Sequence, residues 1–290
     1  MKKFAVLILS LCLVLCACAM AEEPAAYNEY TIILQGAEYE IPATVCLPVD
    51  AENCPAVVML HGTGSTRDEA GNGYAYAAPV LAATYGVATI RIDFPGNGES
   101  TADYMQYTFD SAVADALTAA AYMASLDCVD AEKLGVMGWS QGGTDAMLAA
   151  GRTDIFSSVV TWAGAPFMAL DGFFCEADYE EAKQNGFFVM EFDWRENLNV
   201  SLQWCEDVMT TDVLAVFSAF EGPVLAIAGE EDDTVDPDCA NQIVAVNTNE
   251  VSATCFIPGM DHTFNVFTGD LSALYTAIDA TGTFFAETLK

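Results

Sequence analysis

The chain has 290 residues, and 53% of them are hydrophobic, which is enough for one large buried core. Its 42 acidic residues outnumber nine lysines and arginines, so the formal net charge is -33 at pH 7. A charge of this sign and size excludes nucleic acid and anionic membrane surfaces as partners, and it disfavours anionic substrates. We interpret most of it as a solvated acidic surface that keeps the protein soluble.

The first residues have the composition of an export signal. Two lysines precede an apolar run over 4–20, and small residues stand at Ala19 and Ala21. This pattern predicts a signal peptide over 1–21 and a secreted or cell-surface protein. Two alternatives are open: the letters LCAC resemble a bacterial lipobox, in which case Cys18 carries a lipid that is the protein's one membrane contact, or the run is an uncleaved anchor.

The rest of the chain alternates between strand and helix patterns. "EYTIILQG" and "YEIPATVCLP" alternate apolar and polar residues and predict an antiparallel strand pair. Continuous apolar runs, typical of strands buried on both faces, follow in "CPAVVMLHG", "YGVATIRIDFPG", "EKLGVMGWS", "FSSVVTWAG", "EGPVLAIAG" and "VSATCFIPG". Helical patterns lie between them at about 73–84, 108–125, 141–151, 237–247 and 270–289. The alternation predicts one α/β domain over 22–290 with a doubly wound, mostly parallel sheet.

The segment over about 166–220 interrupts this alternation. It is too long for an ordinary crossover, and its pieces "DYEEAKQNGFF" and "LNVSLQWCEDVMTTDVLAVFSAF" have helical patterns. We therefore predict an inserted helical cap. Its aromatic residues could line an aryl or acyl pocket, although we expect most of them to form the cap's own core. They are Phe167, Phe173, Phe174, Phe187, Phe188, Phe192, Trp194 and Trp204.

Cleavage after position 21 leaves seven cysteines, an odd number, so at least one thiol stays free. Export permits disulfides, and the first pairs to consider are Cys46 with Cys54 and Cys175 with Cys205. No spacing such as C-x-x-C is present, so the sequence predicts no metal site.

The motif Gly138-Trp139-Ser140-Gln141-Gly142 stands where a predicted strand meets a predicted helix. This placement resembles the nucleophile elbow of α/β-hydrolases, in which a sharp turn exposes a serine at the helix N-terminus. Close neighbours then require glycine two positions away on each side, and the helix dipole favours a developing oxyanion. The alternative is an ordinary helix start with Ser140 as its N-cap.

A serine nucleophile needs a general base, and the sequence holds two histidines. His61 follows the third predicted strand and is interpreted as structural. His262 follows the last predicted strand, where an α/β-hydrolase places its base, and a histidine in a surface loop is the alternative. Several carboxylates in "LAIAGEEDDTVDP" could orient it; the pattern G-x-x-D-x-x-V favours Asp232, then Asp233, and a solvated acidic turn is the competing interpretation.

The oxyanion donors should be backbone amides. One is expected from Gln141, directly after the nucleophile, and the other from Thr63 in the loop after "HG". Gly62 and Gly64 permit that loop to approach a substrate closely, although a plain glycine turn would have the same composition.

Five ordered motifs, "HGTGS", "RIDFPGNGES", "GWSQGG", "GEEDDTV" and "IPGMDHTF", resemble bacterial α/β-hydrolases related to cinnamoyl (feruloyl) esterases. Dienelactone-hydrolase-like and serine-aminopeptidase-like enzymes are near relatives of that group. The resemblance implies a triad of Ser140, Asp232 and His262, with Thr63 and Gln141 as the oxyanion hole. Dienelactone hydrolases proper use cysteine, so the serine favours the esterase side.

The resemblance also implies a binding pocket formed by the insertion. Asp93 and Ser100 in "DFPGNGES" are interpreted as stabilising their loop. We therefore predict a secreted serine hydrolase of small carboxylic esters, with aryl or hydroxycinnamoyl esters among them, and no cofactor. The alternatives are a serine peptidase of aminopeptidase type, a thioesterase, and a binding protein that uses a hydrolase scaffold without catalysis.

Overall fold

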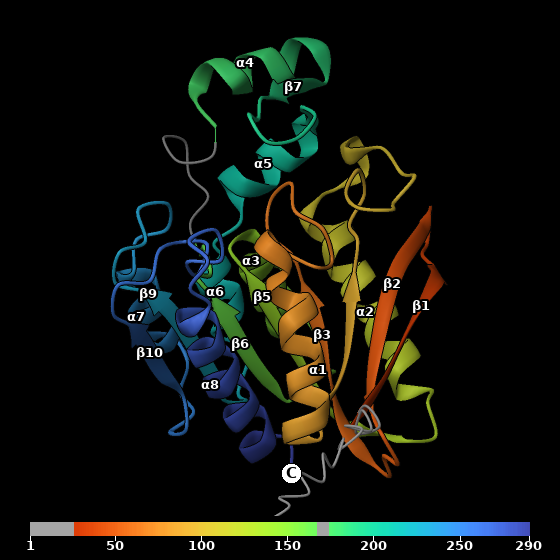
Figure 1. Ribbon diagram of the computed structural model, residues 1–290. Coiled ribbons are helices and arrows are strands. Elements are labelled where there is room, and N and C mark those ends of the chain that lie inside the picture. Colours follow the sequence, from red (N-terminus) through yellow and green to blue (C-terminus); the bar gives the residue numbers. More distant parts are fainter. Residues whose placement is uncertain (1–25, 167–173) are drawn as a thin grey trace, which may run out of the picture.

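The computed structural model describes residues 26–166 and 174–290, so the predicted signal peptide, Cys18, Phe167 and Phe173 lie outside the described residues. Its centre is an eight-stranded sheet with the order β1-β2-β4-β3-β5-β6-β9-β10 (Figure 1). These strands are Tyr27–Gln35 (β1), Glu40–Pro48 (β2), Cys54–Leu60 (β3), Ala88–Ile92 (β4), Val129–Trp139 (β5), Ser158–Trp162 (β6), Val224–Gly229 (β9) and Ala253–Ile257 (β10).

The pairing of the strands agrees with the sequence patterns. β1 and β2 form the predicted antiparallel pair, and β2 also runs antiparallel to β4. The other strands are parallel to their neighbours, and each contains one of the continuous apolar runs. Successive side chains of a strand point to opposite sides, so each buried strand contributes side chains to a core on both faces of the sheet. In β3, for example, Val58 packs in one core layer and Val57 in the other. The predicted doubly wound, mostly parallel sheet is confirmed.

Helices cover the sheet in two layers. α1 and α8 lie side by side on one face, and α2 and α3 pack together on the other (Figure 1). The five predicted helices are present as Gly73–Tyr85 (α1), Phe109–Ala124 (α2), Gln141–Arg152 (α3), Asp238–Ala245 (α7) and Ser272–Thr288 (α8). Two short 3-10 helices add Ala70–Asn72 (η1) and Tyr104–Gln106 (η2). None of the helices in the described part of the chain is long and apolar enough to cross a membrane.

The insertion between β6 and β9 is not purely helical. It contains Glu176–Asn185 (α4), an antiparallel hairpin of Phe187–Met190 (β7) and Leu198–Ser201 (β8), Leu202–Thr210 (α5) and Val213–Phe217 (α6). The helical prediction for "GFF" and "LNVS" was wrong. Gly186, with φ 85°, ends α4, and the next residues form the hairpin because buried Leu198 and Val200 alternate with exposed Asn199.

We refer to residues 174–210 as the cap. In Figure 1 its helices α4 and α5 stand above the main body, beyond the ends of the strands. Phe174, Phe188 and Trp204 form its buried centre, with ring centroids 5.9 Å apart for the two phenylalanines and 5.6 Å for Phe174 and Trp204. α6 instead packs against α3, where a Cβ atom on Gly151 would lie 2.4 Å from the Val216 carbonyl oxygen.

All seven cysteines in the described residues are free thiols, so the pairs considered from the sequence are not formed. Cys46 lies on β2 and Cys54 on β3, and β4 stands between these strands. Neighbouring strands lie about 4.8 Å apart, so two strands with a third between them are about 9.5 Å apart. This separation exceeds the ~7 Å limit for the Cα atoms of a disulfide. In the cap, Cys175 is exposed at the start of α4, whereas the thiol of Cys205 is buried.

Candidate active site

Ser140 stands at the sharp turn between β5 and α3. Its φ and ψ are 55° and -119°, a region that non-glycine residues rarely adopt. A Cβ atom on Gly138 would lie 1.8 Å from the Gly142 carbonyl oxygen, and one on Gly142 would lie 2.1 Å from the Leu60 carbonyl oxygen. Both flanking glycines are therefore required by space. The Ser140 side chain makes no capping hydrogen bond, which argues against the alternative that it serves as an N-cap.

The hydroxyl of Ser140 faces His262, in the loop after β10. Ser140 Oγ lies 3.2 Å from His262 Nε2, and His262 Nδ1 lies 2.9 Å from Asp232 Oδ2 and 3.1 Å from Oδ1. When Nδ1 donates its proton to the carboxylate, Nε2 is left as an acceptor for the serine hydroxyl. Three residues from the ends of three parallel strands thus form one continuous chain of hydrogen bonds.

Asp232 is held in place by its own loop after β9. The backbone N–H groups of Thr234 and Val235 both donate to Asp232 Oδ1 at 2.9 Å, and the residue is only 8% exposed. Asp233, the other candidate, is exposed, and its carboxylate contacts the Thr234 hydroxyl instead. Of the two neighbouring carboxylates, the structure therefore places Asp232 against His262.

The loop that carries His262 is held in place by contacts with Trp139, the last residue of β5. The indole N–H of Trp139 donates to the His262 carbonyl at 3.1 Å, and the Asp261 carboxylate accepts the N–H groups of Thr263 and Asn265, each at 2.9 Å. The rings of Trp139 and Phe264 pack with centroids 4.4 Å apart. The strand that carries Ser140 thus also supports the loop that carries His262.

His61 is structural, as predicted. It is 2% exposed and joins the ends of β3 and β4, because its Nε2 accepts the Phe94 N–H at 3.1 Å while Nδ1 contacts the Gly62 carbonyl oxygen at 2.8 Å. With Nε2 as acceptor, Nδ1 must be the protonated nitrogen. Burial lowers the pKa of His61, so the ring stays neutral.

Thr63 and Gln141 are in contact with each other next to the turn that carries Ser140. The Thr63 hydroxyl donates to Gln141 Oε1, and Thr63 lines the same cavity as Ser140. Gln141 is the first residue of α3, so its backbone N–H has no acceptor within the helix. The structure thus brings the two residues predicted to supply these donors next to each other and close to Ser140.

Loop 61–70, which carries Thr63, is fastened from its inner side by a residue that the sequence motifs did not indicate. Glu69 is 8% exposed, with φ 64°. Its Oε1 accepts the Gly62 N–H, and its Oε2 accepts the Ser65 hydroxyl and the Ala70 N–H, both at 2.7 Å. One carboxylate therefore closes the loop on itself next to Thr63.

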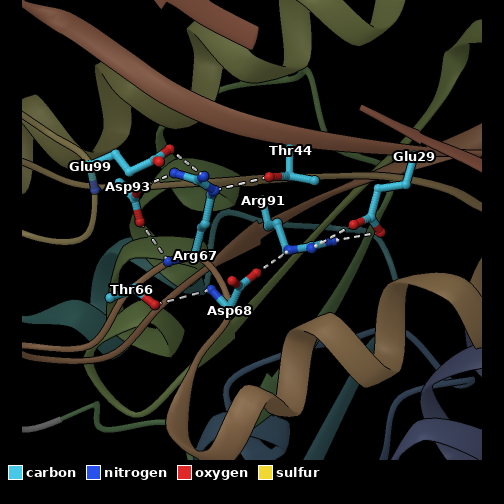
Figure 2. Close-up of polar contacts among 8 residues, drawn as sticks. All are labelled: Glu29, Thr44, Thr66, Arg67, Asp68, Arg91, Asp93 and Glu99. Atoms are coloured by element: carbon cyan, nitrogen blue, oxygen red, sulfur yellow. Dashed lines mark hydrogen bonds and ion pairs between the residues drawn. The ribbon is translucent and has the colours of Figure 1, made fainter. Parts of the chain in front are cut away.

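The outer side of loop 61–70 is fastened by Arg67 (Figure 2). Its guanidinium pairs with Asp93 and Glu99 and donates to the Thr44 hydroxyl at 2.9 Å. Asp93 is 1% exposed and also accepts the backbone N–H groups of Arg67 at 2.7 Å and Glu99 at 2.9 Å. Asp93 stabilises its loop, as interpreted from the sequence, and it binds a second loop as well.

A second arginine extends this network to the edge of the sheet (Figure 2). Arg91 of β4 donates to Asp68 Oδ1 at 2.8 Å and to both oxygens of Glu29 at 3.0 and 3.2 Å. Glu29 belongs to β1, so the loop beside the serine is connected to the N-terminal hairpin. Its partners are distant in the sequence, which is why no local motif revealed them.

A cavity of about 710 Å³ opens over Ser140 and His262. Its lining is largely apolar and includes the aromatic side chains of Phe192 and Trp194 from the cap and of Phe267 from the loop after His262. Trp194 and Phe267 are 66% and 73% exposed, so they stand at the mouth. The two cap rings are among those expected to line a pocket, whereas Phe267 was missed because it carries no motif.

Two carboxylates are buried on α2 and α3, the two helices that pack together on one face of the sheet. Asp145 of α3 is fully buried; the Tyr107 hydroxyl donates to its Oδ2 at 2.5 Å, and Oδ1 has no partner among the described residues. Asp115 of α2 accepts the Tyr39 hydroxyl at 2.8 Å. Burial raises the pKa of Asp115 to about 7 and that of Asp145 to about 8, where the nearby Asp115 charge adds a smaller contribution in the same direction.

Comparison with known proteins gives the family. The sequence profile of the prolyl oligopeptidase family matches residues 74–268. A curated relative, 2,6-dihydropseudooxynicotine hydrolase of Paenarthrobacter nicotinovorans, is 28% identical over 199 residues, which are 67% of this chain and 48% of the relative. The chain thus spans about half the length of that relative.

Solved structures show the same fold. Est1E of Butyrivibrio proteoclasticus, solved with bound ferulic acid, superposes with a TM-score of 0.71 at 21% identity, covering 89% of this chain and 99% of the other. A dienelactone hydrolase of Anabaena variabilis superposes with a TM-score of 0.63 at 18% identity over 91% and 100%. The expected resemblance and the α/β-hydrolase fold are confirmed, and the chain belongs to the prolyl oligopeptidase family, a family of serine hydrolases.

Proposed function

We propose that this protein is an exported serine hydrolase that cleaves neutral carboxylic esters of modest size. The observation that carries the proposal is the chain of hydrogen bonds from Asp232 through His262 to Ser140, on an elbow whose geometry glycine alone permits. A helix N-cap or a surface histidine would require neither the strained serine nor the ordered partners. The same observation argues against a binding protein without catalysis.

In the proposed mechanism, Ser140 Oγ attacks the ester carbonyl as its proton passes to His262 Nε2. Asp232 holds the imidazole in the required tautomer and stabilises its positive charge. The carbonyl oxygen becomes an oxyanion between the backbone N–H groups of Thr63 and Gln141, and His262 then protonates the departing alcohol. Water, activated by the same histidine, attacks the acyl-enzyme and restores Ser140.

The cavity supports substrates with an apolar or aromatic group. Phe192, Trp194 and Phe267 offer ring faces and edges, and no lysine or arginine is among the described residues that line the cavity. The acidic net charge disfavours substrates that carry a free carboxylate. Aryl and hydroxycinnamoyl esters fit this environment, and ferulic acid is the ligand of the structural relative Est1E.

A serine peptidase is the second candidate, because the matching family is that of prolyl oligopeptidase. A substrate panel separates the candidates: p-nitrophenyl acetate, a feruloyl ester, an acyl thioester and aminoacyl anilides. We expect turnover of the two oxygen esters. Cleavage of the anilides alone would replace the esterase proposal by the peptidase, and cleavage of the thioester alone by a thioesterase.

The role of Ser140 is tested by Ser140→Ala. We expect kcat on the favoured ester to fall by about 10⁴-fold or more, because only binding and oxyanion stabilisation remain. A fluorophosphonate probe should label the wild-type protein at Ser140 and leave Ser140→Ala unlabelled. A folded wild-type protein that neither turns over an ester nor reacts with the probe would contradict the enzymatic proposal.

Export is supported by the lysines, the apolar run over 4–20 and the small residues before 22. Mass spectrometry of the protein recovered outside the cytoplasm is expected to find an N-terminus at Glu22. A mature chain that begins with a lipid-modified Cys18 would instead establish the lipid anchor, and retention of the full chain in the cytoplasm would contradict export.

A further inference from the structure

An arm of the cap rests directly on loop 61–70. The arm comprises residues 191–197, between β7 and β8. Gly64 has φ 71°, and a Cβ atom on it would lie 3.3 Å from both Phe192 Cζ and Arg195 Cδ. Glycine at this position lets the arm pack against the loop backbone, one residue after Thr63.

Arg195 provides the polar part of this contact. Its Nη1 donates to the Gly64 carbonyl and to Asn97 Oδ1, both at 2.5 Å, and its Nη2 donates to the Gly96 carbonyl at 3.1 Å. Its Nε donates to the Glu196 carbonyl at 3.0 Å, which fixes the side chain against its own arm. One guanidinium thus joins the cap to two loops of the main body.

The partners of Arg195 are unusual for this protein. Arg67 and Arg91 each pair with two carboxylates, whereas the described part of the chain gives Arg195 neutral oxygens only. The sequence has 42 acidic residues, so the neutral partners of Arg195 do not reflect a shortage of carboxylates. A planar fork of donors is suited to holding several carbonyl groups in fixed positions, which a single ammonium does less well.

The aromatic side chains of the arm complete the arrangement. Arg195 lies over the Phe192 ring, 5.8 Å from its centroid, and the rings of Phe192 and Trp194 meet edge to face at 5.3 Å. Both rings line the cavity above Ser140. The guanidinium that holds the Gly64 carbonyl therefore also holds the wall of the cavity.

We propose that Arg195 is a positioning residue, which locks the cap arm onto loop 61–70 and thereby sets the place of the Thr63 amide in the oxyanion hole. This inference rests on the proposed function, since it takes Thr63 as an oxyanion donor. Glu69 fixes the loop from within and Arg67 from outside, while Arg195 ties it to the cap. One side chain then both holds the aromatic wall of the cavity and positions the oxyanion donor.

The test compares Arg195→Ala, Arg195→Gln and Arg195→Lys with the wild type. The substrate is p-nitrophenyl acetate, whose acyl group is too small to need the aromatic wall. A displaced oxyanion donor acts on the transition state, so we expect kcat to fall about 10- to 100-fold in the alanine and glutamine variants, with KM changing less than about threefold. Lysine should recover part of the loss. Arg152→Ala, which removes an arginine paired with exposed Asp110, is the matched control and should keep wild-type kinetics.

A transition-state analogue gives the second measurement. Trifluoroacetophenone adds to the serine and places an oxyanion in the hole, so its Ki should rise by the factor by which kcat/KM falls. Unchanged kcat and Ki in folded Arg195→Ala and Arg195→Gln, even with a higher KM for a feruloyl ester, would overturn the inference and leave Arg195 as a cap contact. If the alanine variant does not fold, Arg195→Lys and Arg195→Gln decide by the same two measurements. An inert wild type would instead be a failure of the proposed function.

Discussion

The fully buried carboxylate of Asp145 predicts that the protein loses stability as the pH rises. Its pKa is about 8 in the folded chain against an ordinary value of 3.8. Between these values the folded protein holds a proton that the unfolded chain has released. Asp145 therefore lowers the free energy of unfolding only above the unfolded pKa. From there the free energy of unfolding falls by about 1.4 kcal/mol per pH unit until the folded pKa is reached. Over this window the free energy of unfolding falls by about 6 kcal/mol.

The substitution Asp145→Asn removes this titration with little change of shape. Urea unfolding at intervals from pH 5 to pH 8.5 gives the free energy of unfolding of both proteins. We expect the wild type to lose stability across the range and Asp145→Asn to follow a slope shallower by about one proton. The remaining slope comes from Asp115, whose pKa is raised to about 7, and from His61, whose lowered pKa acts in the opposite direction below its ordinary value of 6.5.

The comparison depends on the slope because the new amide, like the old carboxyl, has a buried polar atom without a partner, which lowers stability at every pH. Asp154→Asn, at an exposed position, controls for the loss of one negative charge and should keep the wild-type slope. Parallel curves for the wild type and Asp145→Asn would refute the reasoning, since Asp145 would then titrate alike in both states.

Two further predictions concern the elbow and its partners. Asp232→Asn should reduce kcat on p-nitrophenyl acetate by about 10⁴-fold, because the imidazole loses its required tautomer, whereas Asp233→Asn should leave kcat unchanged; a large loss in Asp233→Asn with little loss in Asp232→Asn would reassign the acid. Gly142→Ala should lower the free energy of unfolding by at least about 2 kcal/mol and abolish fluorophosphonate labelling, since its Cβ would lie 2.1 Å from the Leu60 carbonyl. Wild-type stability and labelling in this variant would show that the turn tolerates a side chain.

Much of the main body could be predicted from the sequence because its signals are local. A continuous apolar run followed by glycine marks a buried parallel strand, and the strand before Ser140 was recognised in this way, while the helix after it was recognised from its helical pattern. The general base was also easy to assign, because the sequence has two histidines and His262 is the one that follows the last strand. The positions of Ser140 and His262 at strand ends follow from that order, and the structure brings their side chains together.

Other features depend on contacts between distant parts of the chain. The hairpin β7–β8 was predicted as helix because "LNVS" leads into the helical pattern of α5 without a break. Cys46 and Cys54 are close in sequence, yet the sheet order inserts β4 between their strands. Glu69 and Arg195 carry no motif, and the value of each comes from the backbone groups that the fold presents to it.

The fastening of loop 61–70 has a consequence for how activity arises during folding. The loop is ten residues long, but the groups that hold it come from β4, from the segment after β4 and from the cap, as far as 131 positions away. Contacts of such separation form late because long stretches of chain must first be brought together. We therefore expect hydrolytic activity to be among the last properties that the folding chain acquires. A partly folded or truncated chain is then expected to be inactive, and activity recovered after refolding would report that the whole chain has come together.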